Sequence, residues 1–228
     1  MMIPATHSEI EQIYIAAELA GSRTLCVTAC QSGQGTTSLA MALAERYLLA
    51  GYRTLYVDLN LHNPSFSPLV LGGNSMENWI EHTPSMRCFN GLPAPQLSDN
   101  LLSYKDPSNL KAKVAEWQGD YQRVVIDTSP LLNINRGNIP AQVVASACDH
   151  TVLSVLSSVT GRHEVKQAAD MLTDSGATLL GTVLNSCLQP TLTSELCREI
   201  ERLIFLPQSW RNKLKNRVRQ NRFLSIPI

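Results

Sequence analysis

Residues 24–37 have the sequence TLCVTACQSGQGTT, an apolar run that passes into a turn containing Gly33 and Gly35. Residues 36–50 follow and are rich in Ala and Leu. This order predicts a strand, a glycine-containing loop and a helix. Backbone N–H groups at the start of a helix can bind phosphate. Taken alone, the segment is as typical of an ordinary structural turn as of a phosphate site.

Two further apolar runs end in an acidic residue. Residues 54–57 lead to Asp58, and residues 123–126 lead to Asp127. In an open parallel sheet, ligands bind outside the carboxyl ends of the strands. We therefore expect both carboxylates to lie in one crevice with the glycine-containing loop.

Strand-like and helix-like segments alternate along most of the chain. Beyond the segments above, apolar runs and amphipathic stretches occupy residues 8–20, 152–156, 164–175 and 179–184. The alternation predicts an α/β fold, a single-domain, doubly wound, mostly parallel sheet with helices on both faces. We expect this domain to span residues 1–206, followed by a basic tail over residues 207–228.

Residues 61–109 interrupt the alternation, because they are rich in Pro, Asn and Ser. We expect a long surface excursion that contains one short helix, at residues 75–81.

Composition excludes several classes of protein. The 228 residues carry 19 Lys and Arg against 19 Asp and Glu, so overall charge indicates no particular partner. The six cysteines follow no zinc or disulfide spacing. There is no signal-peptide pattern and no apolar stretch of spanning length, so we expect a cytoplasmic protein.

The loop at residues 30–37 departs from a complete phosphate-binding motif. Such a motif needs glycines, a Lys for the β and γ phosphates, and a Ser or Thr for magnesium. Gly33, Gly35 and Thr37 meet these needs, but Thr36 stands at the Lys position and Cys30 at the first Gly position.

Two more segments carry a resemblance to a known family. Residues 54–64 are TLYVDLNLHNP and residues 121–130 are YQRVVIDTSP. They resemble the Walker A′ and Walker B segments of bacterial tyrosine kinases that serve exopolysaccharide export, roughly VLLIDADLRNP and YDYVIIDTPP. Residues 181–185, GTVLN, are similar to the family's GVVLN. The resemblance implies a P-loop NTPase fold with ATP or ADP and Mg²⁺ as cofactors.

The resemblance also implies roles for individual residues. Asp58 would be the base near the acceptor hydroxyl, Thr37 and Asp127 would hold magnesium with Asn60 as a weaker ligand, and Asn185 would lie near the adenine. A turn role for Asn185 remains an equal alternative. The implied nucleotide-binding set is Gly33, Gln34, Gly35, Thr36, Thr37, Ser38 and Asn185.

Departures from the family pattern limit the activity that we expect. Thr36, Asn60 and His62 each replace a charged residue of the family. Residues 9–15 lack the arginines of the family's oligomerisation helix, which leaves oligomer formation open, and the last tyrosine is Tyr121. We therefore predict a regulatory or scaffolding partner with weak or no catalysis. Its partner would be a polysaccharide copolymerase or another inner-membrane export component.

Two alternatives stay open. The first is an active ATPase or protein tyrosine kinase whose missing charge a partner supplies. The second is a MinD/ParA-like positioning ATPase, although Gln31 stands where that class carries its signature Lys.

The tail is basic and amphipathic. Trp210, Leu214 and Val218 recur at helical spacing among Arg and Lys. An anionic membrane surface, an acidic partner helix and nucleic acid are candidate partners, nucleic acid being the least favoured. Contact with a membrane would place the protein peripherally at the inner membrane. The alternative is a last helix that packs on the core with a solvated basic face.

Overall fold

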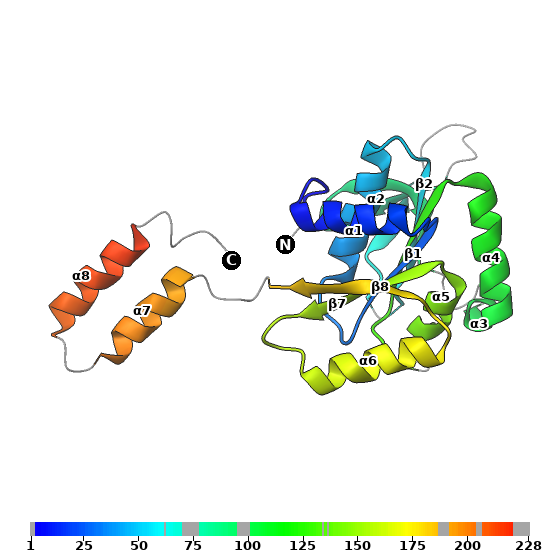
Figure 1. Ribbon diagram of the computed structural model, residues 1–228. Coiled ribbons are helices and arrows are strands. Elements are labelled where there is room, and N and C mark those ends of the chain that lie inside the picture. The colour runs from blue at the N-terminus through cyan, green and yellow to red at the C-terminus, as the bar shows by residue number, and fades with distance from the viewer. Residues whose placement is uncertain are drawn as a thin grey trace. The chain divides into compact units, whose positions relative to one another are not determined.

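An eight-stranded sheet forms the centre of the fold, in the order β3-β4-β5-β2-β6-β1-β7-β8 (Figure 1). The strands are β1 (Thr24–Ala29), β2 (Thr54–Leu59), β3 (Phe66–Leu69), β4 (Trp79–His82), β5 (Arg87–Leu92), β6 (Arg123–Thr128), β7 (His150–Leu156) and β8 (Leu179–Asn185). Strands β5, β2, β6, β1, β7 and β8 are parallel to one another, and β4 and β3 continue the sheet in antiparallel pairs. The predicted mostly parallel α/β sheet is confirmed.

The computed structural model describes residues 3–61, 63–69, 78–94, 101–133, 135, 137–186, 192–203 and 207–220. The chain divides into two compact units, residues 1–185 and 186–228. Residue 206, where we expected the first domain to end, lies outside the described residues.

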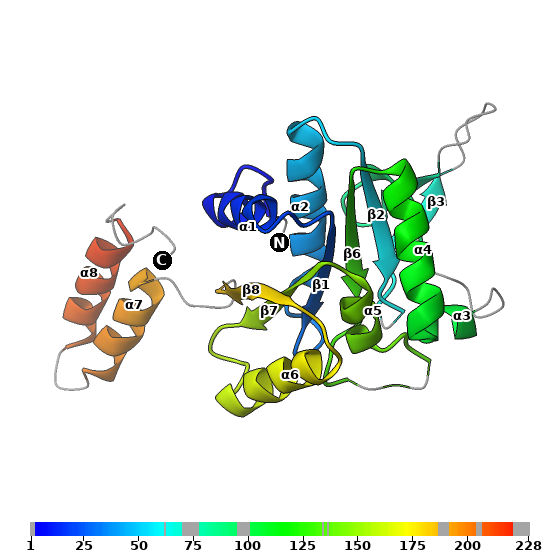
Figure 2. The same ribbon diagram turned by 45° about the vertical axis from the view of Figure 1, so that its right-hand side comes forward.

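Helices cover both faces of the sheet, as Figure 2 shows. The helices of the first unit are α1 (Ser8–Leu19), α2 (Thr36–Leu49), α3 (Leu101–Lys105), α4 (Pro107–Asp120), α5 (Ala141–Ala147) and α6 (Arg162–Asp174). Buried strand residues alternate between two cores, since Leu25 and Val27 pack with α1 and α2 whereas Cys26 packs with α4, α5 and α6. A strand buried on both faces favours a nearly continuous apolar run, which is why four of the six residues of β1 are apolar and the other two are threonines.

The prediction of a surface excursion over residues 61–109 is wrong. This segment contains β3, β4 and β5, and Tyr56 of β2 packs against Phe66 and Phe89 from it. Glycine is required at position 91 inside β5, because a Cβ there would clash with the carbonyl oxygen of Tyr56. A composition rich in Pro and Asn concealed these three strands.

The predicted helix at residues 75–81 is also wrong where it can be checked. Residues 75–77 lie outside the described residues, and Trp79, Ile80 and Glu81 belong to β4. Ile80 is fully buried while its two neighbours are half-buried, which is the alternation of a strand.

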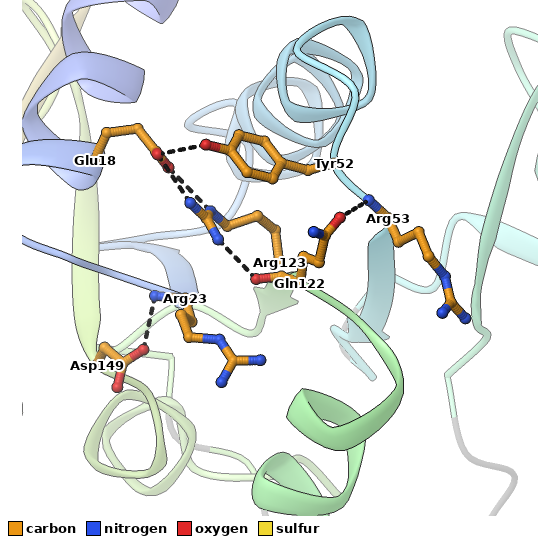
Figure 3. Close-up of polar contacts among 7 residues, drawn as sticks. All are labelled: Glu18, Arg23, Tyr52, Arg53, Gln122, Arg123 and Asp149. Atoms are coloured by element: carbon orange, nitrogen blue, oxygen red, sulfur yellow. Dashed lines mark hydrogen bonds and ion pairs between the residues drawn. The ribbon is translucent and has the colours of Figure 1, made fainter.

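A cluster of polar contacts connects neighbouring elements at the N-terminal ends of the parallel strands (Figure 3). Arg123 donates to both carboxylate oxygens of Glu18 at 2.9 and 2.8 Å, and the Tyr52 hydroxyl donates to the same carboxylate at 2.9 Å. Asp149 accepts from the backbone N–H of Arg23 at 2.9 Å. These contacts join α1 to β6 and fix the start of β1. The candidate site lies at the opposite, C-terminal ends of these strands.

The second unit contains two helices that pack against each other, α7 (Leu192–Arg202) and α8 (Gln208–Arg219). The Lys215 ammonium lies 2.7 Å from the Glu201 carboxylate, which links α8 to α7. Among the described residues, no helix is both long enough and apolar enough to cross a membrane.

Candidate functional site

The glycine-containing loop lies between the end of β1 and the start of α2. Gly33 and Gly35 have φ of +80° and +87°, in the left-handed region that favours glycine. Gly35 has a second constraint, because a Cβ there would lie 2.6 Å from Nδ2 of Asn185. Thr36 and Ser38 belong to the first turn of α2, as expected for the start of a phosphate-binding helix.

Gln34 holds this loop in place through both its side chain and its carbonyl group. Its side-chain oxygen accepts from the backbone N–H of Cys30 at 3.1 Å, and its amide nitrogen donates to Oγ1 of Thr160 at 2.7 Å. Its carbonyl oxygen accepts from Ser154 Oγ at 2.7 Å and from Asn185 Nδ2 at 3.1 Å. The structure therefore brings Asn185 to the loop, while its place beside an adenine stays a prediction. Sequence reasoning missed Ser154 and Thr160.

Thr37 and Asp127 meet at the carboxyl end of the sheet. Thr37 Oγ1 donates to Asp127 Oδ2 at 2.6 Å, and the Tyr56 hydroxyl lies 3.4 Å from the same oxygen. Asp127 is buried, and its other oxygen, Oδ1, has no hydrogen-bond partner among the described residues. A buried carboxylate oxygen without a donor beside a hydroxyl fits Mg²⁺, which prefers oxygen ligands.

Asp58 lies beside Asp127, because the two residues are register partners on β2 and β6. Its oxygens accept from the backbone N–H groups of Asn60 at 2.9 Å and Ser65 at 3.2 Å. Burial nevertheless raises the pKa of Asp58 to about 6. Burial, and then the Asp58 carboxylate, raise the pKa of Asp127 well above its usual range. Two adjacent buried carboxylates favour retaining a proton, and a bound cation would favour its release.

The remaining candidate residues are less directly connected to this pair. Asn60 is buried, and its side-chain oxygen accepts from the backbone N–H of Asn63 at 3.3 Å, so its role as a metal ligand stays a prediction. His62 lies outside the described residues. Within the part of the chain that the structure describes, no group of three His, Cys, Asp or Glu side chains could hold a metal ion. Magnesium at Thr37 and Asp127 would therefore depend on oxygens from a nucleotide.

An acidic residue that sequence reasoning missed also touches the loop. The Gln31 side-chain amide donates to one oxygen of Glu164, and the other oxygen accepts from the backbone N–H of Gly161 at 2.7 Å. Burial raises the pKa of the Cys30 thiol, and the Glu164 carboxylate raises it further. A negative charge at this position opposes the binding of phosphate. Sequence reasoning recognised Glu164 only as the start of a helix, because its contact with the loop spans 133 residues.

Known proteins resemble this chain over most of its length. It is 27% identical over 177 residues to the putative tyrosine-protein kinase CapB of Staphylococcus aureus, covering 72% of the chain and 75% of the relative. It is 24% identical over 188 residues to the tyrosine-protein kinase CpsD of Streptococcus agalactiae, covering 75% and 79%. The chain is therefore similar, at distant identity, to the bacterial tyrosine kinases, a family of P-loop NTPases. No protein-family model matches it.

Several solved structures share the fold of this chain. The chimerical protein CapA2B2 matches with a TM-score of 0.59 at 23% identity, over 77% of this chain and 81% of that one. The kinase domain of the Escherichia coli tyrosine kinase ETK matches with a TM-score of 0.56 at 17% identity, over 78% and 72%. Cobyrinic acid a,c-diamide synthase of Mycobacterium smegmatis, with bound ATP analog and magnesium, matches with a TM-score of 0.51 at 20% identity, over 72% of each chain.

Proposed function

We propose that this chain is a regulatory or scaffolding member of the bacterial tyrosine kinase family that binds Mg²⁺ and nucleotide weakly and transfers phosphate slowly or not at all. The observation that carries the proposal is Thr36 at the Lys position of a loop whose neighbouring Thr37 and Asp127 remain in contact. In this proposal the residues that would hold magnesium are kept, and the Lys that would contact the phosphates is lost.

The loss of the Lys sets the scale of the effect. A hydrogen bond to a charged group contributes roughly 1.5 to 3 kcal/mol, and a neutral Thr hydroxyl makes a weaker one. The expected loss in affinity or rate is therefore about tenfold to a hundredfold or more. Phosphoryl transfer depends on charge stabilisation, so the rate should suffer more than binding.

Thr37 and Asp127 would hold the magnesium, and the backbone of the loop around Gly33 and Gly35 would contact the phosphates. Magnesium would supply charge neutralisation at the phosphates when bound. Asp58 is the candidate base, but both of its oxygens already accept backbone hydrogen bonds. This arrangement supports a site that binds better than it reacts.

The proposed setting is the biosynthesis or export of a capsule or exopolysaccharide. The curated relatives are tyrosine-protein kinases named CapB and CpsD, and a solved structure with this fold is the CapA2B2 chimera. These names support a polysaccharide copolymerase, or another inner-membrane export component, as the partner. An active kinase or ATPase is the alternative. It would use the same contact between Thr37 and Asp127, and the partner would supply the missing positive charge.

The test compares the wild-type chain with Thr36→Lys in ATP hydrolysis and in phosphotyrosine formation. We expect hydrolysis in the wild type close to the rate without protein, and a rate at least about tenfold higher in Thr36→Lys. Asp127→Ala in the Thr36→Lys background serves as the control that removes magnesium. Wild-type hydrolysis equal to that of Thr36→Lys would show an active enzyme and overturn the proposal.

A further inference from the structure

Helix α8 presents one exposed face made of two apolar and two cationic side chains. Trp210, Lys213, Leu214 and Arg217 have the spacing i, i+3, i+4 and i+7, which places them on one side of a helix. Trp210 is 64% exposed and Leu214 is 40% exposed, and both cations are exposed as well. We call these four residues the aromatic-basic face.

The contacts between α8 and α7 use a different side of the helix. Lys215 Nζ lies 2.7 Å from the Glu201 carboxylate, and Arg211 Nη1 donates to the Glu201 carbonyl oxygen at 3.1 Å. Val218, on the same side as these two residues, is half-buried. Packing against α7 therefore leaves the aromatic-basic face exposed. The stripe predicted from sequence divides here, because Val218 is half-buried whereas Trp210 and Leu214 are exposed.

All the charged side chains of α8 are positive. The helix contains five Lys and Arg residues and no Asp or Glu. The next residues in the sequence include Arg222, Phe223 and Leu224, which continue the same composition. An exposed surface with cations and large apolar side chains complements a partner that is both anionic and able to accept apolar groups.

We propose that the aromatic-basic face binds the surface of an anionic lipid bilayer. Tryptophan is enriched at the interface between membrane and water, where its ring lies at the level of the head groups. Lys213 and Arg217 flank the apolar pair and would contact anionic head groups, while Leu214 enters the boundary of the acyl chains. A nucleic acid would use the cations but would leave Leu214 without a contact, so the bilayer accounts for all four side chains.

The inference concerns residues of the second unit and goes beyond the proposed nucleotide site. Its test is flotation of the full-length chain with vesicles of phosphatidylcholine alone or mixed with phosphatidylglycerol. Binding is expected to the anionic vesicles and to weaken as salt is raised. The variant Lys213→Gln/Arg217→Gln should bind about fivefold more weakly for each charge removed, and Trp210→Ala about tenfold more weakly.

Two controls separate this face from general attraction. The variant Lys111→Gln/Lys166→Gln removes the same charge from exposed positions of the first unit and should bind like the wild type. Vesicles with brominated acyl chains should quench the fluorescence of the bound wild type, and Trp210→Phe should lose that quenching while it still floats.

Three results would each overturn the inference. They are the absence of flotation with anionic vesicles, equal losses in the two double variants, and the absence of quenching that depends on Trp210. Binding of duplex or single-stranded DNA that needs Lys213 and Arg217, without vesicle binding, would assign the face to nucleic acid and count against a bilayer.

Discussion

Thr37 Oγ1 donates a hydrogen bond of 2.6 Å to Asp127 Oδ2, which joins the first turn of α2 to the end of β6. Asp127 Oδ1 is buried without a hydrogen-bond partner among the described residues. Thr37 and Asp127 lie next to the loop in which Thr36 stands at the Lys position. In the proposed function this pair would hold magnesium, while the loop would bind phosphate weakly.

Thr37→Ala should weaken nucleotide binding about tenfold when magnesium is present, because a metal ligand and the hydrogen bond to Asp127 are both lost. In EDTA the variant and the wild type should bind alike. Thr37→Ser is the matched control, since it keeps the hydroxyl and should retain the dependence on magnesium. A loss of the same size with and without magnesium would show that Thr37 acts only in the loop's structure.

Glu164→Gln should strengthen nucleotide binding by about twofold to fivefold at low salt, because it removes a negative charge beside the loop. The amide can still accept one of the two hydrogen bonds that Gln31 and Gly161 donate to the carboxylate. Isothermal titration provides the measurement. Glu116→Gln, an exposed acid on α4, controls for the change in net charge. Equal effects of the two substitutions would contradict a local role for Glu164.

Gly35→Ala should destabilise the protein more than Gly33→Ala. Both residues have a positive φ, so both substitutions cost about 1 kcal/mol of backbone strain. At Gly35 the new Cβ also lies 2.6 Å from Asn185 Nδ2, whereas at Gly33 it meets nothing within 4 Å. Adding Asn185→Ala should recover part of the Gly35→Ala loss in chemical denaturation. Additive effects would mean that no close approach exists.

The pH dependence of stability should reveal the buried carboxylate pair in magnesium-free protein. Burial raises the pKa of Asp58 to about 6, so the folded state binds more protons than the unfolded state, whose carboxyl has the usual pKa of about 3.9. The free energy of unfolding should therefore increase by about 1 kcal/mol as the pH falls from about 7 to about 5.

Asp58→Asn supplies the control for this pH dependence. It removes the titrating group and one charge beside Asp127, so the slope of stability against pH should become smaller. Urea denaturation in EDTA at several pH values gives the slope. An unchanged slope in Asp58→Asn would assign the dependence to other residues.

The central strands were predictable because each is buried on both faces and therefore has a mostly apolar sequence. Strands β1, β2 and β6 are such cases. Because β2 and β6 are parallel, Asp58 and Asp127 could be predicted to lie next to each other at their C-terminal ends. Strand β8 was also predicted, although much of it is exposed at the edge of the sheet.

Other parts could not be predicted, because their signals come from tertiary contacts. Strands β3 and β4 have only four residues each, and Gly91 in β5 serves close packing against Tyr56. Likewise, the contacts of Gln34 with Ser154 and Thr160 span 120 and 126 residues. The spacing of residues along the chain does not predict hydrogen bonds between residues so far apart in sequence.

Calorimetric titration of ATP into wild type and Thr36→Lys measures whether the chain keeps a metal position beside a weakened phosphate position, as we propose. Each is titrated with magnesium and with EDTA. We expect weak binding in the wild type that depends on magnesium, and binding about tenfold to a hundredfold tighter in Thr36→Lys. Equal affinity in the two proteins would contradict it, as would wild-type binding that does not respond to magnesium.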